Sequence, residues 1–338
     1  MIKQSKLMLN KCGGLPKVIV AIGRFLAKSL NWEAMNTNFI HQLENNPELA
    51  SIHSLFSWLD SYFHNCPDEL KPCIFYLSIF PRHHGIRRRR LVRRWIAEGY
   101  SRDTDGNLAE VNGENYFSRL VNLSMLTDAE RGVNAAGEVT GTGTSTGRKM
   151  AMCNVNDFFR EYIVSRRMEE NHVFALEGRC SQTTRRTGRH LVIDQSWDGD
   201  ENVFNRIEFS RLRSVTVFGP WKPFLASDKM RVLRVLDLEG TEGLTDYDIK
   251  NIVKRLPRLK FLSLRKCKNI FRLPKSLGRL RQLQTLDVRH TAVARLPTTV
   301  VKLQKLQYVR AGNTPAVSHV ALLAVTLSAL RCLAGSRI

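Results

Sequence analysis

Residues 259–288 read LKFLSLRKCKNIFRLPKSLGRLRQLQTLDV, and this stretch indicates how the C-terminal part of the chain folds. It holds two copies of the pattern Leu-x-x-Leu-x-Leu or its Val variant. Across the chain the pattern starts at Leu212, Leu233, Leu259, Leu283 and, in frayed form, Leu306. Successive starts are 21, 26, 24 and 23 residues apart, so this part of the sequence is a repeat with a nearly constant period.

A period of about 20–29 residues with this pattern is typical of leucine-rich repeats. The Leu-x-Leu alternation predicts a short strand with one buried face, and the apolar spacing after Leu273-Pro274 and Leu296-Pro297 predicts a helical turn. Because one repeat cannot bury its own apolar face, we expect the repeats to stack. We therefore predict an α/β solenoid of leucine-rich repeats over residues 206–313, followed by an atypical apolar tail at 314–338.

The upstream part, residues 1–130, reads as helical, because its apolar residues recur with helical spacing. Three such faces are Leu15, Val18, Ile19, Ile22 and Leu26; Ile52, Leu55, Phe56, Leu59 and Phe63; and Leu91, Val92, Trp95 and Ile96. Residues 132–147 are rich in glycine and threonine and predict an exposed turn or hairpin insertion, after which a helix resumes over 151–168. Several helices followed by a short hairpin predict a winged-helix domain.

These patterns predict an α+β multidomain chain. Residues 1–64 form a helical subdomain, residues 65–177 the winged-helix domain, and residues 178–205 a polar connector to the repeats.

The net charge, the cysteine spacing and the length of the apolar stretches limit the classes of function that the chain can have. The 338 residues include 52 Lys and Arg against 31 Asp and Glu, a net charge of +21, which favours contact with polyanions. The seven cysteines form no Cys-x-x-Cys pair, so we expect neither a zinc site nor a disulfide scaffold. The longest uncharged stretch runs from Ala311 to Leu330, and its apolar part is shorter than the ~20 residues that a membrane span requires, so we expect no span.

Three segments carry motifs of one family. Residues 14–19 (GLPKVI) resemble the Gly-Leu-Pro-Leu-Ala segment of plant NB-ARC proteins. Residues 69–100, which include YLSIFP and WIAEGY, resemble the winged-helix region of plant nucleotide-binding leucine-rich-repeat (NLR) disease-resistance proteins. Residues 153–157 (CNVND) stand where that family carries its Met-His-Asp motif. With the repeats in the same order, the resemblance covers roughly residues 11–313.

The resemblance implies a cytoplasmic immune receptor. In that family ADP holds a closed state, exchange for ATP opens it, and the repeats sense a pathogen effector or a guarded host protein. By resemblance, Pro16 would contact adenine, Asn156 would face the β-phosphate, and Asp157 would complete the motif.

The sequence departs from the family in two ways. It lacks the phosphate loop Gly-x-x-x-x-Gly-Lys-Ser/Thr, since the stretch from Gly141 to Met150 has the wrong spacing and the wrong residues. Asn156 replaces the family histidine and cannot become cationic. We therefore expect an N-terminally truncated member with a degenerate switch, no bound cofactor and little nucleotide affinity.

Seven arginines occupy residues 82–94, with no acidic residue among them. We interpret them as the solvated face of an amphipathic helix. The alternative is a polyanion contact through Arg87, Arg88, Arg89, Arg90, Arg93 and Arg94, which would make the chain a basic winged-helix nucleic-acid binder.

We expect no catalysis. Single carboxylates such as Asp60, Asp68 and Glu69 suit helix capping, and we expect Cys66 and Cys73 to be buried structural residues. The predicted function is protein recognition in plant defence. Its candidate contact positions lie beside the strand leucines on the concave, solvent-facing side: Ser263, Arg265, Asp287 and Arg289.

The predicted partners are a pathogen effector or a guarded host protein, with other NLR chains as further candidates and nucleic acid not expected. We expect a cytoplasmic protein, with the nucleus and the plasma-membrane periphery as alternatives. A non-functional gene remnant is the third reading of the sequence.

Overall fold

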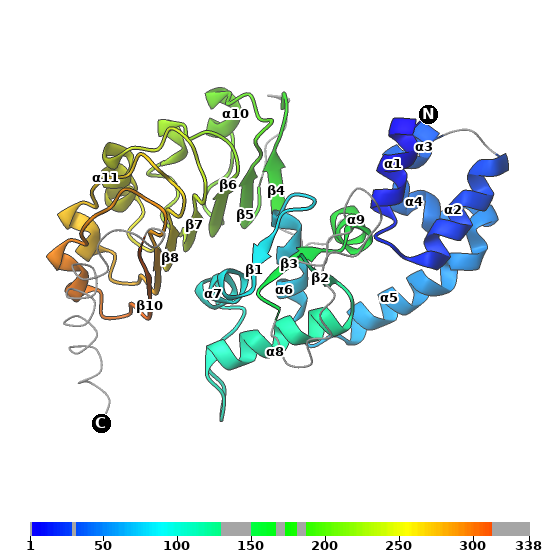
Figure 1. The fold of residues 1–338 in the computed structure, drawn as a ribbon, viewed down its shortest axis with the longest axis horizontal. Coiled ribbons are helices and arrows are strands. Elements are labelled where there is room, and N and C mark those ends of the chain that lie inside the picture. The colour runs from blue at the N-terminus through cyan, green and yellow to red at the C-terminus, as the bar shows by residue number, and fades with distance from the viewer. Residues whose placement is uncertain (1, 29–31, 130–149, 167–172, 181–186, 313–338) are drawn as a thin grey trace. The chain divides into compact units, whose positions relative to one another are not determined.

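The computed structural model describes residues 2–28, 32–129, 150–166, 173–180 and 187–312. Its contacts divide the chain into two compact units, one of Met1–Ile96 with Tyr100–Asn171 and one of Ala97–Gly99 with His172–Ile338. Figure 1 shows the helices and strands of both units.

The first unit is mainly helical and contains a small antiparallel sheet. Its elements are α1 (Ile2–Lys11), α2 (Pro16–Lys28), α3 (Trp32–Thr37), α4 (Phe39–Asn45), the 3-10 helix η1 (Pro47–Ile52), α5 (His53–Asn65), α6 (Lys71–Tyr76), the 3-10 helix η2 (Leu77–Ile79), β1 (Ile86–Arg87), α7 (Arg88–Glu98), α8 (Ala109–Asn122), β2 (Leu126–Asp128), β3 (Met152–Val155) and α9 (Asp157–Ser165). The strands pair in the order β1-β3-β2, all antiparallel.

The helical faces predicted in this unit are confirmed. Along α2 the residues Val18, Ile22 and Leu26 are buried, and α5 buries Phe56, Leu59 and Phe63. An aromatic cluster joins α5 to α9: the ring of Phe63 lies 5.4 Å from that of Tyr162, and the ring of Phe56 lies 6.1 Å from that of Phe158. Such pairs contribute roughly 0.5–1.5 kcal/mol beyond the area that they bury.

Two predictions for this unit need correction. The helix predicted over 151–168 begins only at Asp157, because Met152–Val155 pairs as β3 with β1 and β2. Residues 1–130 are not purely helical either, since β1 and β2 lie among them. The insertion predicted at 132–147 lies outside the described residues.

The second unit is a parallel sheet with its strands in chain order, β10-β9-β8-β7-β6-β5-β4 (Figure 1). Its elements are β4 (Val173–Leu176), β5 (His190–Ile193), α10 (Glu201–Asn205), β6 (Ser214–Val217), η3 (Pro223–Leu225), β7 (Val235–Asp237), α11 (Asp246–Arg255), β8 (Phe261–Ser263), η4 (Lys275–Arg279), β9 (Thr285–Asp287), η5 (Thr298–Lys302) and β10 (Tyr308–Arg310). Each predicted repeat therefore supplies one strand.

The core of this unit is the repeated leucine row. In the middle of neighbouring strands Leu236, Leu262 and Leu286 lie directly opposite one another, and each is at most 1% exposed. The predicted helical turns are confirmed as η4 and η5, which bury Leu277 and Val300. Burial of a leucine side chain contributes about 1.5–3 kcal/mol, so the repeats are held together mainly by this row.

The sheet begins earlier than the repeat pattern predicts. The range 178–205, predicted as a polar connector, contains β5 and α10, and β4 precedes it at Val173–Leu176. The repeat signature is broken there because Gly188 stands three residues before Leu191, where other repeats carry a leucine. The backbone pairing nevertheless continues through β5 without a break.

Among the described residues, no helix is both long and apolar enough to cross a bilayer. The apolar tail predicted at 314–338 falls outside that part of the chain.

Replacing Leu286 with alanine should lower the free energy of unfolding by roughly 2–5 kcal/mol, because it leaves a cavity in the fully buried leucine row. Denaturation followed by circular dichroism measures the loss. Val301→Ala is the matched control, since Val301 is 55% exposed and its change should stay within about 0.5 kcal/mol. Equal losses in the two variants would contradict the leucine-row core.

Candidate functional site

The loop between α1 and α2 meets the N-terminus of α9. After α1 the chain turns through Gly13 and Gly14, whose φ values of +57° and +73° suit glycine, and α2 starts at Pro16, a favoured first helical residue. The side chain of Asn156 caps α9: its Oδ1 accepts a hydrogen bond from the N–H of Phe158 at 3.0 Å. Its Nδ2 donates to the carbonyl oxygen of Gly13 at 2.9 Å. We call this contact the Gly13–Asn156 junction.

Position 13 requires glycine for two reasons. Its φ angle is positive, and the junction leaves no room for a Cβ. A Cβ at position 13 would lie 2.2 Å from Oδ1 of Asn156 and 2.7 Å from the backbone nitrogen of Phe158. At Gly14 a Cβ would meet nothing within 4 Å. Only the first glycine of the pair is therefore held by close packing.

The structure brings two of the three resemblance-derived segments together. Asn156 is 8% exposed at the junction, Asp157 follows in the first turn of α9, and Pro16 is exposed at the start of α2. The segments that meet lie 143 residues apart in the chain. The sequence carried a motif for each segment, but only the three-dimensional structure reveals the hydrogen bond between them.

Charged residues surround the start of α9. Glu161 forms an ion pair with Arg82 and another with Lys11, whose Nζ lies 3.4 Å from Oε2 of Glu161. Burial raises the pKa of the Asp157 carboxyl, and its electrostatic interactions with His83, Arg82 and Arg160 oppose that shift. Electrostatic contacts thus tie α1 to α9 beside the junction.

The residues at the junction do not fit a nucleotide. Binding a diphosphate needs a loop of backbone N–H groups with a lysine and a magnesium ligand, and the sequence contains no such loop. The Asn156 amide already bonds within the protein on both sides, to Gly13 and to Phe158. Pro16 and the neutral amide supply no charge for a phosphate, and the nearby cations Lys11 and Arg82 are paired with Glu161.

The arginine cluster lies on β1 and α7, and much of it packs inside the first unit. Arg94 is fully buried; its Nε donates to the Tyr76 hydroxyl at 2.9 Å, and its guanidinium lies 5.3 Å from the ring centre of Phe80. Arg88 pairs with Glu114 and lies 4.8 Å from the ring centre of Phe117.

The predicted solvated face is therefore wrong for much of this cluster. Arg90, Arg93 and Arg94 are buried, Arg87 and Arg88 are half-buried, and Arg89 is exposed. The physical reason, seen at Arg88 and Arg94, is that a guanidinium packs favourably on an aromatic face. Arginines held by internal partners weaken the interpretation as a nucleic-acid surface.

The four candidate contact positions lie on β8, β9 and the residues that follow them. Ser263 and Asp287 stand opposite each other in the strand register. The Nε of Arg265 lies 3.3 Å from a carboxylate oxygen of Glu239, and Arg289 binds both carboxylate oxygens of Asp287. This hydrogen bonding raises the pKa of the Arg289 guanidinium above its usual value.

The expected exposure is wrong for two of these four. Ser263 is 1% exposed and Asp287 7% exposed, whereas Arg265 and Arg289 are half-buried. A short side chain in the middle of a sheet is covered by its neighbours on both adjacent strands, which lie about 4.8 Å away. The longer arginines reach beyond that cover.

Cys66 and Cys73 are buried, as expected. Burial raises the pKa of the Cys73 thiol and raises that of Cys153 to about 12. Such thiols stay protonated at neutral pH and are poor nucleophiles. Among the described residues, no cluster of His, Cys, Asp and Glu has the arrangement that a metal ion needs.

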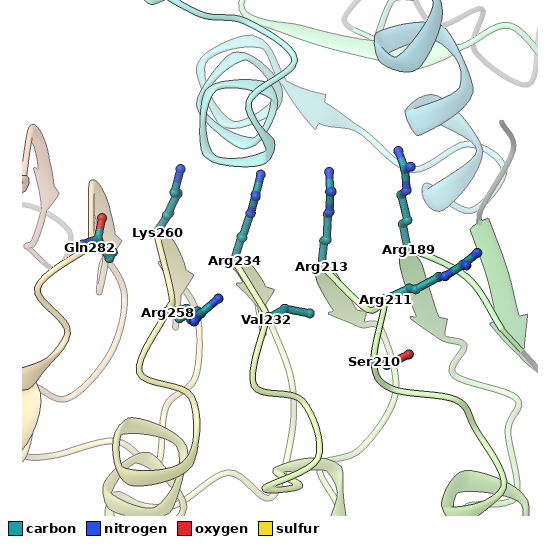
Figure 2. Close-up of a pocket in the computed structure, with 9 residues that line it drawn as sticks. All are labelled: Arg189, Ser210, Arg211, Arg213, Val232, Arg234, Arg258, Lys260 and Gln282. Atoms are coloured by element: carbon teal, nitrogen blue, oxygen red, sulfur yellow. The ribbon is translucent and has the colours of Figure 1, made fainter.

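A basic surface that the sequence analysis did not single out lies on the second unit. Figure 2 shows a groove lined by side chains from the starts of successive strands. The lining residues are Arg189, Ser210, Arg211, Arg213, Val232, Arg234, Arg258, Lys260 and Gln282. We call it the basic groove. The signal in the sequence was the recurrence of Arg-Leu-Arg or Arg-Leu-Lys at the leucine that opens a repeat, as at 211–213 and 258–260.

Comparisons with known protein families agree with both units. Residues 79–140 match the family described as disease resistance protein winged helix domain, and residues 211–336 match a leucine-rich repeat region. Both matches extend beyond the described residues.

Disease-resistance proteins of two plants are similar to this chain. Disease resistance protein Pik-2 of Oryza sativa subsp. japonica is 31% identical over 310 residues, which cover 89% of this chain and 28% of that protein. Disease resistance protein RGA4 of the same plant is 32% identical over 307 residues, 88% of this chain and 28% of the relative. The RPP8-like protein 2 of Arabidopsis thaliana is 27% identical over 323 residues, 90% of this chain and 34% of the relative.

The chain thus spans about 28% of the length of the rice relatives that it matches. Within this chain the winged-helix match precedes the leucine-rich-repeat match, and this is the domain order that the sequence predicts. The chain therefore belongs to the plant NLR family of disease-resistance proteins.

Proposed function

We propose that this chain acts in plant immunity and that its leucine-rich repeats recognise another protein, a pathogen effector or a guarded host protein. The relatives supply the immune context, since their names describe disease resistance. The observation that carries the proposal is the register of the parallel sheet, which places a polar residue next to the buried leucine of each strand.

Two rows of the sheet illustrate this. The row of Leu236, Leu262 and Leu286 hardly changes from strand to strand, because it fills the core. The neighbouring row reads Asp237, Ser263 and Asp287. This polar row is nearly buried, so the surface that a partner can reach begins with the half-buried arginines that follow it, Arg265 and Arg289.

The arginines beyond this row are already held in place. Arg289 is fixed by Asp287, and Arg265 by Glu239. Side chains that are ordered before binding lose less conformational entropy when a partner binds. Paired charges of both signs also suit a polar protein surface better than a uniformly charged one. We propose Arg265 and Arg289, with the flanking Ser263 and Asp287, as part of the recognition surface of a repeat solenoid.

We further propose that the Gly13–Asn156 junction is a structural contact and that the nucleotide switch of the family is degenerate in this chain. Asn156 satisfies the first turn of α9 and a loop carbonyl, and both bonds stabilise the helical packing. A histidine would bring a charge that titrates near neutral pH, whereas asparagine does not titrate. We place the protein in the cytoplasm, as the resemblance implies.

Disrupting the gene for this chain in its host plant should increase the growth of at least one pathogen in a panel of isolates. Complementation with the natural gene, or with Arg272→Ala/Arg279→Ala as control, should restore resistance, because those two arginines lie exposed away from the strand rows. Arg265→Ala/Arg289→Ala should not restore it at equal protein abundance on an immunoblot. Unchanged pathogen growth across the panel would refute the immune role.

The chain as given should show no binding of ADP with magnesium at micromolar affinity, because it has no phosphate loop. Isothermal titration calorimetry with tens of micromolar protein measures this. Heat that fits a single site with a Kd below about 10 μM, a binding free energy beyond about −6.8 kcal/mol, would overturn the degenerate-switch proposal.

Gly13→Ala should destabilise the first unit by about 2–5 kcal/mol, since the residue needs a positive φ and a Cβ would overlap Asn156. Gly14→Ala is the matched control: it shares the positive φ but has open space, so only the backbone cost of about 1–2 kcal/mol applies. Urea denaturation of the two variants measures the difference. Identical losses would mean that the junction is not closely packed.

A further inference from the structure

The helix side of the second unit presents three exposed apolar side chains. Figure 1 shows α10 and α11 on one side of the sheet of this unit. Tyr247 in the first turn of α11 is 70% exposed, Phe271 before η4 is 60% exposed, and Val301 in η5 is 55% exposed. One such side chain is ordinary on a protein surface, but three on neighbouring repeats form a surface that gains free energy when it leaves water.

The sheet holds these three segments side by side. On the helix side α11 packs beside η4, and η4 beside η5. At the strand starts the backbone forms a hydrogen-bonded ladder. The N–H of Arg234 donates to the carbonyl oxygen of Arg213, that of Lys260 to Arg234, and that of Gln284 to Lys260, each at 2.7 Å, and that of Gln307 to Gln284 at 2.9 Å. Neighbouring rungs are about 4.8 Å apart, so the repeats keep a constant pitch.

Hydrogen bonds also fix the backbone on the helix side. The Oδ1 of Asp246, the first residue of α11, accepts a bond from the N–H of Phe271 at 2.8 Å. Tyr247 follows Asp246 directly. The hydroxyl of Thr299 in η5 donates to the carbonyl oxygen of Lys275 in η4 at 2.7 Å. The segments that carry the apolar side chains are thus ordered before a partner binds, which lowers the entropy cost of binding.

Lysines stand on the same three segments. Along α11, Tyr247, Lys250 and Lys254 recur at helical spacing, opposite a buried face of isoleucine and valine. The exposed lysines of the three segments are Lys250, Lys254, Lys268, Lys275 and Lys302. Within the described part of the chain none of their ammonium groups forms an ion pair. We call these five lysines, with Tyr247, Phe271 and Val301, the helix-side patch.

Acidic residues are scarce around this patch. Residues 249–338 contain one, Asp287, which lies on the sheet and is bound by Arg289. In the repeat before α11, Asp228 lies 3.6 Å from Arg255. Neither carboxylate forms an ion pair with a lysine of the patch.

Three further acidic residues precede or begin α11, and they enter the charge count. Asp246 binds the N–H of Phe271, Asp248 is buried in the capping box of the helix, and Glu242 is exposed in the preceding loop. The five lysines against these three carboxylates leave a net charge of +2, and the exposed arginines of the same repeats raise it. The patch is therefore complementary to an anionic surface.

A phospholipid surface fits this pattern better than a protein partner does. Protein interfaces gather their aromatic residues in one desolvated centre with a polar rim, whereas the apolar side chains of the patch stand on separate segments among lysines. A membrane accepts such side chains singly, because each enters the boundary between head groups and acyl chains while the lysines reach the head groups. About four to eight basic residues beside an apolar face are typical of proteins that bind anionic lipids.

We propose that the helix-side patch binds the surface of an anionic phospholipid membrane through its three apolar side chains and five lysines. This surface is separate from the protein-recognition surface proposed above, which lies on the sheet, and does not depend on it. Binding there would hold the repeats at a membrane while the sheet stays free for a protein partner.

Cosedimentation of the whole chain with phospholipid vesicles tests the proposal. The probe is a phosphatidylcholine vesicle with about 30% phosphatidylserine in ~0.15 M salt, compared with a vesicle of phosphatidylcholine alone. We expect at least about tenfold tighter binding to the anionic vesicle, because the lysines attract its head groups.

Two pairs of variants separate the patch from the net charge of the chain. Tyr247→Ser/Phe271→Ser keeps every charge and should weaken binding to the anionic vesicle at least about fivefold, since two aromatic side chains no longer enter the head-group boundary. Its matched control is Leu9→Ser/Leu108→Ser, which removes two exposed apolar side chains from the first unit and should change binding less than about twofold.

The second pair removes charge. Lys250→Gln/Lys254→Gln should weaken binding at least about fivefold. Its matched control is Lys17→Gln/Lys28→Gln, which removes two exposed lysines of α2 and should change binding less than about twofold. All substituted side chains are exposed, so the variants should fold, and circular dichroism verifies that they do.

The outcomes separate the proposal from its rivals. Failure of the natural chain to sediment with anionic vesicles overturns it, and so does equal binding to the neutral vesicles. Equal losses in a patch variant and its control overturn it as well, because the attraction would then come from net charge alone. A hexaglutamate peptide that displaces the chain from the vesicles at equal charge concentration would assign the patch to an acidic protein partner. Losses confined to the two patch variants support the proposal.

Discussion

The second unit depends on the burial of one continuous row of leucine and valine side chains beneath a parallel sheet. All seven strands of its described sheet are only three or four residues long and could not persist alone, since isolated short strands are at best marginally stable. Each strand is ordered because the leucines of the strands before and after it cover its own. The core runs in this way from Leu176 to Leu306, and every polar position on the sheet takes its place from it.

A strand of this sheet was predictable where its buried contacts leave a local sequence pattern. Strands β6 to β10 were predictable, because the repeat itself is the signal that buries them. Strands β4 and β5 were not, since Gly188 replaces an expected leucine, and there the backbone pairing outweighs the missing side chain. At β3 the sequence predicts the start of a helix, although Cys153 and Val155 alternate with Asn154 and Asn156 and pair across the sheet.

The site was less predictable than the fold, because its contacts join distant segments. No local pattern indicates that Asn156 donates to Gly13, although a family resemblance had marked both neighbourhoods. The roles of the arginines also depend on contacts with distant segments. Arg94 is buried against Tyr76 and Phe80, while Arg213 stands in an open row, yet both follow a leucine or another arginine in a basic stretch. Their neighbours in space, not their charge, decide which role each one has.

The hydrogen-bonded ladder at the strand starts carries a consequence for how such a chain diverges. Because every rung is set by the sheet, the gain or loss of a whole repeat by unequal recombination changes how many side chains stand in the row but leaves their pitch unchanged. A single codon change between arginine and glutamine at one rung then adjusts the charge in unit steps. Length and charge of the row are thus two independent variables for natural selection.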